Sequence, residues 1–267
     1  PISISLFRVS VPVSLIFSNS VLLGENEDLL CCRDMLWENS THGVNQHNVG
    51  MYDCDINSVE DLLSYISTAS IYCVEREGKY LNFPPVNILE YFTLDSLTGE
   101  YTENGKAYQM KFSPQPEDIS YLRTFKFEDL TYRGTIEFRS SCCQPIGDVM
   151  TVAAFHLGLM DRTDRLKKLI EADNSIYHNG YNAAELRHQL VHRDLPKYVD
   201  SDGVYDLARK VLELSFEGLA QRGQGEEKYL EPLFERVKNR TNPAKTMLDR
   251  LKNGEGIYSI VKSYAEA

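Results

Sequence analysis

The run Thr135-Ile-Glu-Phe-Arg-Ser-Ser-Cys-Cys-Gln-Pro145 is the most informative stretch of this chain. Its first residues alternate between polar and apolar, which predicts a strand with Glu137 and Arg139 on the same face, since side chains two residues apart in a strand point the same way. Such a pair suits a metal-nucleotide site, because Glu binds a hard divalent cation through oxygen and Arg neutralises a phosphate that the cation bridges. The same spacing is also typical of an ordinary ion pair on a solvated strand.

Several segments around this strand resemble the glutamate-cysteine ligase (γ-glutamylcysteine synthetase) family of the plant and bacterial type. They follow the family's order and roughly its spacing over about residues 6 to 250. The sharpest are the Arg33-x3-Trp37 unit and the Glu137-x-Arg139 strand. The matching segments are Phe17-Ser-Asn-Ser20, Leu29-Leu-Cys-Cys-Arg-Asp-Met-Leu-Trp37, Gly50-Met51, a helix-like stretch ending near Tyr72, and Gly134 to Gln144.

The resemblance implies a fold and an activity. The fold is α+β, with an antiparallel sheet of the glutamine synthetase-like catalytic kind and a C-terminal helical region. The activity is that of a cytoplasmic ATP-dependent carboxylate-amine ligase of glutathione biosynthesis, which joins glutamate to cysteine through an acyl phosphate to form γ-glutamylcysteine. The expected small molecules are therefore glutamate, an amine such as cysteine, and ATP with Mg²⁺.

The resemblance also implies roles for four residues. Glu137 and Arg139 are the expected catalytic residues, with Glu137 as a magnesium ligand and Arg139 in contact with the transferred phosphoryl group. Arg33 and Trp37 are expected to bind the amino-acid substrate, because a guanidinium holds a carboxylate bidentately while an aromatic ring packs on an aliphatic stem. Plant-type members read Arg-Gly-Ala-Asp where this chain has Arg139-Ser-Ser-Cys142, so no role of that Asp is carried over to Cys142.

An alternative of a different class stays open. Members of the family carry an N-terminal portion with further strand glutamates, and this chain is expected to begin after that portion. It would then be a non-catalytic fragment or a scaffold protein that retains the ligase fold for binding or self-association. This alternative leaves two protein partners open. One is a second copy of the chain in a homo-oligomer, and the other is the missing N-terminal segment.

The composition is that of a globular protein. The 267 residues are 42% hydrophobic and 25% charged, and the formal net charge is -11. We expect no nucleic-acid partner, because such binding needs clustered Lys and Arg, and no membrane partner, because no run of about 18 apolar residues occurs. The six cysteines include the adjacent pairs Cys31-Cys32 and Cys142-Cys143, and none has the C-x2-C spacing of a zinc site.

The local pattern predicts a mixed region over residues 1–147 and a helical region over 148–267, packed on the sheet in the same domain. The first region is expected to contain a helix ending at Phe17, a short strand within 29–37, a helix over 58–72 capped by Asn57 and Glu60, a hairpin over 97–112 that turns at Asn104-Gly105, and paired strands within 125–130 and 135–140. The second is expected to contain helices near 148–171, 181–191, 203–221, 226–240 and 243–252.

One further motif is similar to a known catalytic loop. His192-Arg193-Asp194-Leu195 imitates the loop of protein kinases, but that loop requires an Asn where this chain has Val199, and the glycine-rich loop and the Asp-Phe-Gly motif are absent. We therefore reject a kinase.

Overall fold

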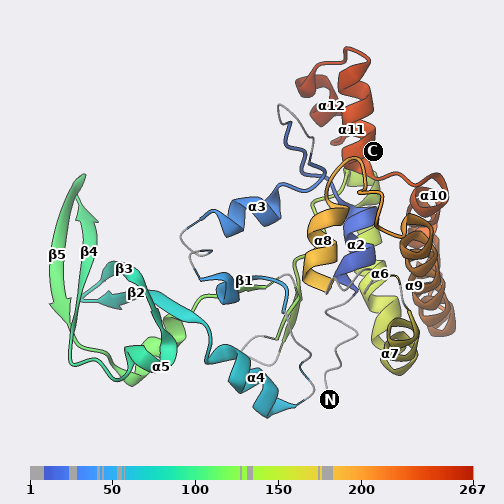
Figure 1. Cartoon of the computed structure of the whole chain (residues 1–267). Coiled ribbons are helices and arrows are strands. Elements are labelled where there is room, and N and C mark those ends of the chain that lie inside the picture. The colour runs from blue at the N-terminus through green and yellow to red at the C-terminus, as the bar shows by residue number, and fades with distance from the viewer. Residues whose placement is uncertain are drawn as a thin grey trace. The chain divides into compact units, whose positions relative to one another are not determined.

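The computed structural model of the chain describes residues 9–23, 29–40, 43, 45–52, 56, 58–126, 128–130, 135–173, 175 and 183–266. It combines helices and strands and includes a four-stranded antiparallel sheet (Figure 1). The chain divides into two compact units, which we name the helical unit (residues 1–34, 51–54 and 127–267) and the sheet unit (35–50 and 55–126). In the described residues, no helix combines the length and apolar character needed to cross a membrane.

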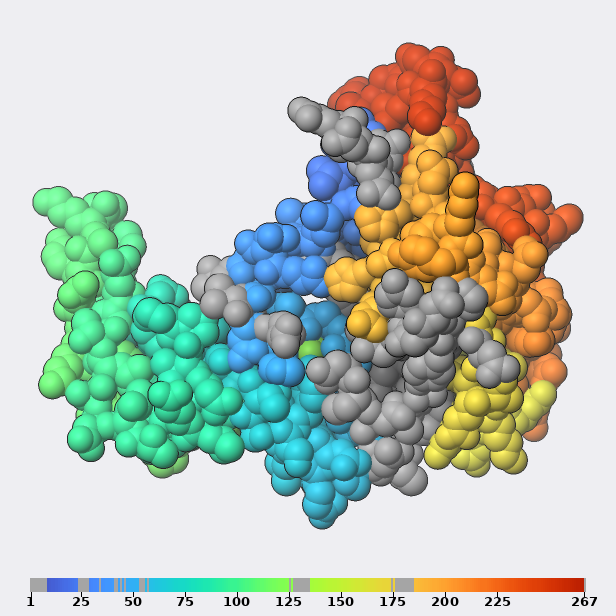
Figure 2. Space-filling view, in the orientation of Figure 1, coloured from blue at the N-terminus to red at the C-terminus, as the bar shows by residue number. Residues whose placement is uncertain are grey.

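The sheet unit is built around four antiparallel strands that pair in chain order: β2 (Ser70–Arg76), β3 (Lys79–Asn87), β4 (Leu97–Glu103) and β5 (Lys106–Phe112). The predicted hairpin is confirmed as β4–β5, and Asn104 and Gly105 take φ angles of 51° and 74° at its turn. Figure 2 shows this hairpin, in light green, as a narrow ridge extending from its unit. The smaller elements are η2 (Gln46–Asn48), β1 (Val49–Gly50), α4 (Val59–Ile66), α5 (Ile88–Tyr91), η3 (Pro116–Tyr121) and β6 (Phe125–Lys126).

A buried carboxylate fixes η3 to the sheet. Asp118 accepts two hydrogen bonds from the Arg76 guanidinium, at 2.7 and 2.6 Å, and one from the Tyr91 hydroxyl at 2.6 Å. Burial raises the pKa of Asp118, but the hydrogen bonds from Arg76 and Tyr91 outweigh it and hold this pKa below its ordinary value. The charge of Arg76 and these hydrogen bonds thus offset the cost of burying a carboxylate in the core.

Two predicted elements of the first region are wrong in part. The helix predicted over 58–72 ends at Ile66, and its capping box is formed by Ser58 and Asp61, while Asn57 lies outside the described residues. The chain enters β2 at Ser70 instead, because Ile71 and Val74 bury their β-branched side chains in the core of the sheet.

The strand predicted within residues 29–37 is also wrong. Leu29 and Cys31 make only isolated bridges, and the chain then forms the helix α3 (Arg33–Glu38). Most residues of α3 are of types that favour a helix, namely Arg, Met, Leu and Glu. The isolated bridges before it do not sustain a strand.

The helical unit surrounds one short apolar helix, α2 (Ser10–Phe17), in which all eight residues are buried. Beside it lie α8 and α9 (Figure 1). The segment predicted as one helix over 148–171 is two helices, α6 and α7. The remaining elements of this unit are β7 (Glu128–Leu130), β8 (Ile136–Phe138), η4 (Ile146–Asp148), α6 (Met150–Met160), α7 (Thr163–Ala172), α8 (Ala183–Leu190), α9 (Ser201–Arg222), η6 (Glu226–Leu230), α10 (Glu231–Asn239), α11 (Pro243–Lys252) and α12 (Ile257–Ser263).

Two glycines allow α6 and α9 to cross closely. A Cβ atom built on Gly158 would lie 2.2 Å from the main-chain oxygen of Ser215, and one on Gly218 would lie 1.9 Å from the oxygen of Gly158. The Ser215 hydroxyl also donates to the Phe155 carbonyl at 2.9 Å. Larger side chains at either glycine would force the two helices apart.

The end of α2 is completed by side chains from distant segments. A helix leaves its last four carbonyls without partners in its own backbone, and in α2 each of the four accepts a hydrogen bond from a side chain. The donors are Ser18 Oγ to Ser14 O (2.6 Å), Asn242 Nδ2 to Leu15 O (2.8 Å), Arg236 Nη1 to Ile16 O (2.9 Å) and Gln144 Nε2 to Phe17 O (2.9 Å).

Arg236 should therefore be a major determinant of stability. It is buried and also pairs with Asp148 at 2.6 Å, so Arg236→Met would leave the Ile16 carbonyl without a donor and Asp148 without its cation. We expect a loss of about 3 kcal/mol in the free energy of unfolding, measured by urea denaturation. Arg209→Met is the matched control, because Arg209 is 45% exposed and its ion pairs are worth about 1 kcal/mol or less. Equal losses in the two variants would contradict this account of α2.

Candidate functional site

The predicted antiparallel pair around Glu137 is present in the helical unit. Strand β8 pairs with β7, and the residue opposite Glu137 in this register is Asp129. Among the described residues β8 has this single neighbour, whereas the resemblance implies a central strand of a wider sheet. Glu137 thus lies on a strand as expected, within a two-stranded ribbon.

Glu137 and Arg139 contact each other directly. The Arg139 Nη2 atom donates to Glu137 Oε2 in an ion pair, and the two side chains are 35% and 30% exposed. This is the ordinary pairing that the spacing alone predicts. A pair that is about one third exposed contributes on the order of 1 kcal/mol or less, so a stronger ligand could separate the two side chains at low cost.

Arg33 is brought against the segment that follows β8. It is the first residue of α3, and its Nη1 atom donates to the main-chain oxygens of Arg139 and Ser141, at 2.9 Å each. Within the described part of the chain, its Nη2 and Nε atoms have no acceptor and it has no carboxylate partner. One nitrogen thus holds the main chain, while the other edge of the guanidinium is available to a ligand.

Trp37 also lies on α3, in the part of this helix that belongs to the sheet unit. Its indole is half-buried. Its place beside the other three candidate residues stays a prediction.

A buried thiol cluster follows the ion pair along the chain. The Cys142 Sγ atom lies 3.6 Å from Cys31 Sγ and 3.4 Å from Ser20 Oγ, and both cysteines are less than 5% exposed. The hydrogen bond with the Cys31 thiol is the main cause that lowers the pKa of Cys142, assisted by Ser20 and by the charge of Arg33 and opposed by burial. Sequence reasoning missed this contact, since no local pattern marks a pairing across 111 residues.

The described residues around Glu137 do not supply a complete set of protein ligands for a metal ion. Among the residues that the structure describes, no group of three or more His, Cys, Asp or Glu side chains could hold an ion. Mg²⁺ is nevertheless commonly bound through one or two carboxylates together with substrate phosphates and water. One carboxylate on β8 therefore fits a magnesium ion that arrives with a nucleotide better than a resident one.

A buried histidine packs against β8. The His156 ring of α6 packs on the Phe138 ring with 4.2 Å between their centroids, and its Nδ1 atom lies 2.8 Å from the Val152 oxygen. Burial lowers the pKa of His156 to about 4. Its buried Nε2 has no hydrogen-bond partner among the described residues, so a proton there would find no acceptor. The imidazole is therefore neutral in the folded protein.

Comparison of the chain with protein-family models found no match, and comparison with curated proteins found none either.

The His156 environment predicts a specific pH dependence of stability. Between the folded pKa of about 4 and the unfolded pKa of about 6.5, the unfolded state binds the proton more tightly, so stability falls as the pH falls through this window. The slope approaches about 1.4 kcal/mol per pH unit. His156→Phe should remove this component, so its unfolding free energy, measured in urea at pH 7, 6 and 5, should fall less steeply than that of the unmodified chain. Parallel curves for the two proteins would contradict a buried neutral imidazole.

Proposed function

We propose that this chain is an ATP-dependent carboxylate-amine ligase. It activates the γ-carboxylate of glutamate as an acyl phosphate with release of ADP, and an amine, with cysteine as the first candidate, then displaces the phosphate to form a γ-glutamyl amide. The observation that carries the proposal is the position of Arg33, which is anchored on the main chain of Arg139 and Ser141 and keeps one edge of its guanidinium available. The finer fold assignment, a glutamine synthetase-like catalytic sheet with a C-terminal helical region, is part of the same proposal.

Arg33 is suited to binding a carboxylate. The planar guanidinium presents its Nε and Nη2 hydrogens in parallel, which matches the two oxygens of a carboxylate. Two hydrogen bonds from Nη1 to main-chain oxygens restrain the guanidinium before a ligand binds, so less side-chain entropy is lost on binding. Together with Trp37, whose ring would pack on the aliphatic stem of the substrate, Arg33 would bind glutamate.

Glu137 and Arg139 are suited to MgATP because they offer opposite charges side by side. Their mutual ion pair contributes little, so the metal could take the carboxylate while phosphate oxygens take the guanidinium. Bound Mg²⁺ would neutralise phosphate charge and orient the transferred group. Arg139 would stabilise the negative charge that develops on that group during transfer.

The direct test uses the full chain with MgATP, glutamate and cysteine. Release of ADP that requires both amino acids, with γ-glutamylcysteine detected by mass spectrometry, would support the ligase; other amines replace cysteine in parallel reactions. Isothermal titration with MgATP and with glutamate tests the alternative function. No heat with either ligand and no product would exclude the ligase and favour a non-catalytic fragment or scaffold used in binding or self-association.

Arg139→Ala should reduce turnover far more than stability. The ion pair with Glu137 is partly exposed, so we expect a change of about 1 kcal/mol or less in the free energy of unfolding. Loss of a group that stabilises developing charge typically lowers kcat by about 100-fold or more. Both quantities are measured on the same preparation, by ADP release and by urea denaturation. If activity and stability fell together, the pair would be structural only.

Arg33→Lys should weaken glutamate binding although the charge is retained. An ammonium group lacks the planar fork and cannot serve both main-chain oxygens and a carboxylate in the same geometry, so we expect about a tenfold rise in the Kd for glutamate, measured by isothermal titration. Arg209→Lys on the exposed face of α9 is the control and should leave this Kd unchanged. An unchanged affinity in Arg33→Lys would remove Arg33 from the substrate site.

A further inference from the structure

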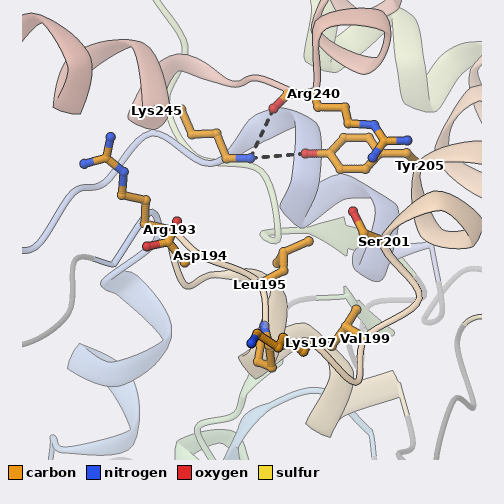
Figure 3. A pocket seen from close by; sticks show the side chains of 10 residues that line it. Arg193, Asp194, Leu195, Lys197, Val199, Ser201, Tyr205, Arg240 and Lys245 are labelled. Carbon is orange, nitrogen blue, oxygen red and sulfur yellow. Dashed lines mark hydrogen bonds between the residues drawn. The ribbon is translucent and has the colours of Figure 1, made fainter.

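A polar pocket lies within the helical unit, and the ligase proposal does not use it. Its volume is about 430 Å³. It is formed by the loop before α9, the first turns of α9, the end of α10 and the start of α11, and Figure 3 shows the side chains that line it. The lining residues are Arg193, Asp194, Leu195, Pro196, Lys197, Val199, Ser201, Tyr205, Arg240 and Lys245.

The charges of this pocket contrast with those of the whole chain. Four of its lining residues are cations and one is an acid, although the chain carries a net charge of -11. Two further acids lie close by, because Arg193 pairs with Asp249 and Arg240 pairs with Asp202. These two carboxylates are 65% and 84% exposed, so solvent screens them more strongly than the groups inside the pocket.

Lys245 is the best-positioned cation. Its Nζ atom donates to the Tyr205 hydroxyl at 3.3 Å and to the Arg240 main-chain oxygen at 3.1 Å, as the dashed lines in Figure 3 show. An ammonium group has three N–H donors, so one remains for a ligand. Burial lowers the pKa of Lys245, which means that the site favours an anion that would compensate the desolvated charge.

Three more donors face the pocket without acceptors in the described part of the chain. The Tyr205 hydroxyl accepts from Lys245 but has no partner for its own proton, and burial raises its pKa to about 12, which keeps it a donor. The Ser201 hydroxyl and the exposed Lys197 ammonium make no hydrogen bond or ion pair with described residues. Lys245, Tyr205, Ser201 and Lys197 thus line one pocket, and each keeps an N–H or O–H that has no acceptor among the described residues.

The backbone at Arg240 adopts a left-handed conformation beside the pocket. Arg240 ends α10 with a φ angle of 51°, in the left-handed region that costs a residue with a Cβ about 1 kcal/mol relative to glycine. Its guanidinium lies over the Tyr205 ring, 5.3 Å from the centroid, and its carbonyl holds Lys245. A glycine would relieve the backbone but would lose the charge beside the pocket.

We propose that this pocket binds a small phosphate-bearing anion through Lys245, Tyr205, Ser201 and Lys197. Donors that approach from several directions suit the tetrahedral oxygens of a phosphate, whereas a planar carboxylate is matched by a single planar fork. The N-termini of α9 and α11 also lie at the pocket, and their dipoles favour negative charge. The site is separate from the one proposed for the ligase and does not depend on it.

The test is isothermal titration of the full chain with pyrophosphate and with inorganic phosphate, and with acetate at the same ionic strength as the planar control. We expect saturable binding of the two phosphates and none of acetate. Lys245→Met should weaken pyrophosphate binding about tenfold or more, and Lys197→Ala about threefold. Because Lys197 is exposed and makes no contact that folding requires, its variant decides the question if Lys245→Met does not fold.

Two control variants test whether the phosphate binds in this pocket and nowhere else on the chain. Lys238→Met removes an exposed lysine of α10 that pairs with Glu235, and it should leave the affinity unchanged. Arg209→Met removes an exposed cation of α9 that belongs to neither proposed site, and it should also leave the affinity unchanged. Absence of saturable phosphate binding, equal binding of acetate, or unchanged affinity in both pocket variants would overturn the proposal. Loss of binding in Arg139→Ala, with binding retained in Lys245→Met and Lys197→Ala, would place the phosphate at the ligase site and overturn the proposal as well.

Discussion

The last turn of α2 is the constraint on which the helical unit depends. Its four terminal carbonyls are buried in an apolar helix, and each unsatisfied one would cost about 1 to 3 kcal/mol. Gln144, Arg236 and Asn242, which satisfy three of them, lie 127, 220 and 227 residues away from their acceptors. The helix is therefore stable only together with these downstream segments. As a result, α2 and the segments around residues 144, 236 and 242 form one cooperative unit.

The same network positions the candidate site. Gln144 donates to the Cys142 carbonyl at 2.8 Å and accepts from Arg236 at 2.7 Å, so the donors that complete α2 also fix the stretch after β8. Asn19 donates to the Cys143 carbonyl at 2.7 Å, and Arg33 holds the carbonyls on the other side of Cys142. The main chain that carries Arg139 is thus held from both ends by side chains of the core.

The sequence predicted those elements whose signals are local. The Asn104-Gly105 turn and the start of α11 after Asn242 follow from side-chain and backbone preferences of adjacent residues. Prediction failed at 67–72, where burial in the sheet favours a strand, and at 29–37, where isolated bridges do not sustain a strand and the chain forms α3. The pairing of Glu137 with Arg139 follows from their spacing. The Cys31–Cys142 contact and the Lys245–Tyr205 pocket do not, because they join residues that only the tertiary fold brings together.

The cations of this acidic chain differ in the groups that accept their hydrogen bonds. This difference indicates where an anionic ligand could bind. Exposed residues such as Arg209 are neutralised by carboxylates. Arg33 and Lys245, by contrast, are held by main-chain carbonyls and a hydroxyl, with no carboxylate partner among the described residues. A neutral acceptor orients a cation without forming an ion pair with it, so the charge of the cation still attracts an anionic ligand. Each proposed site contains one cation held in this way, Arg33 in the first and Lys245 in the second, beside other cations that are paired with carboxylates.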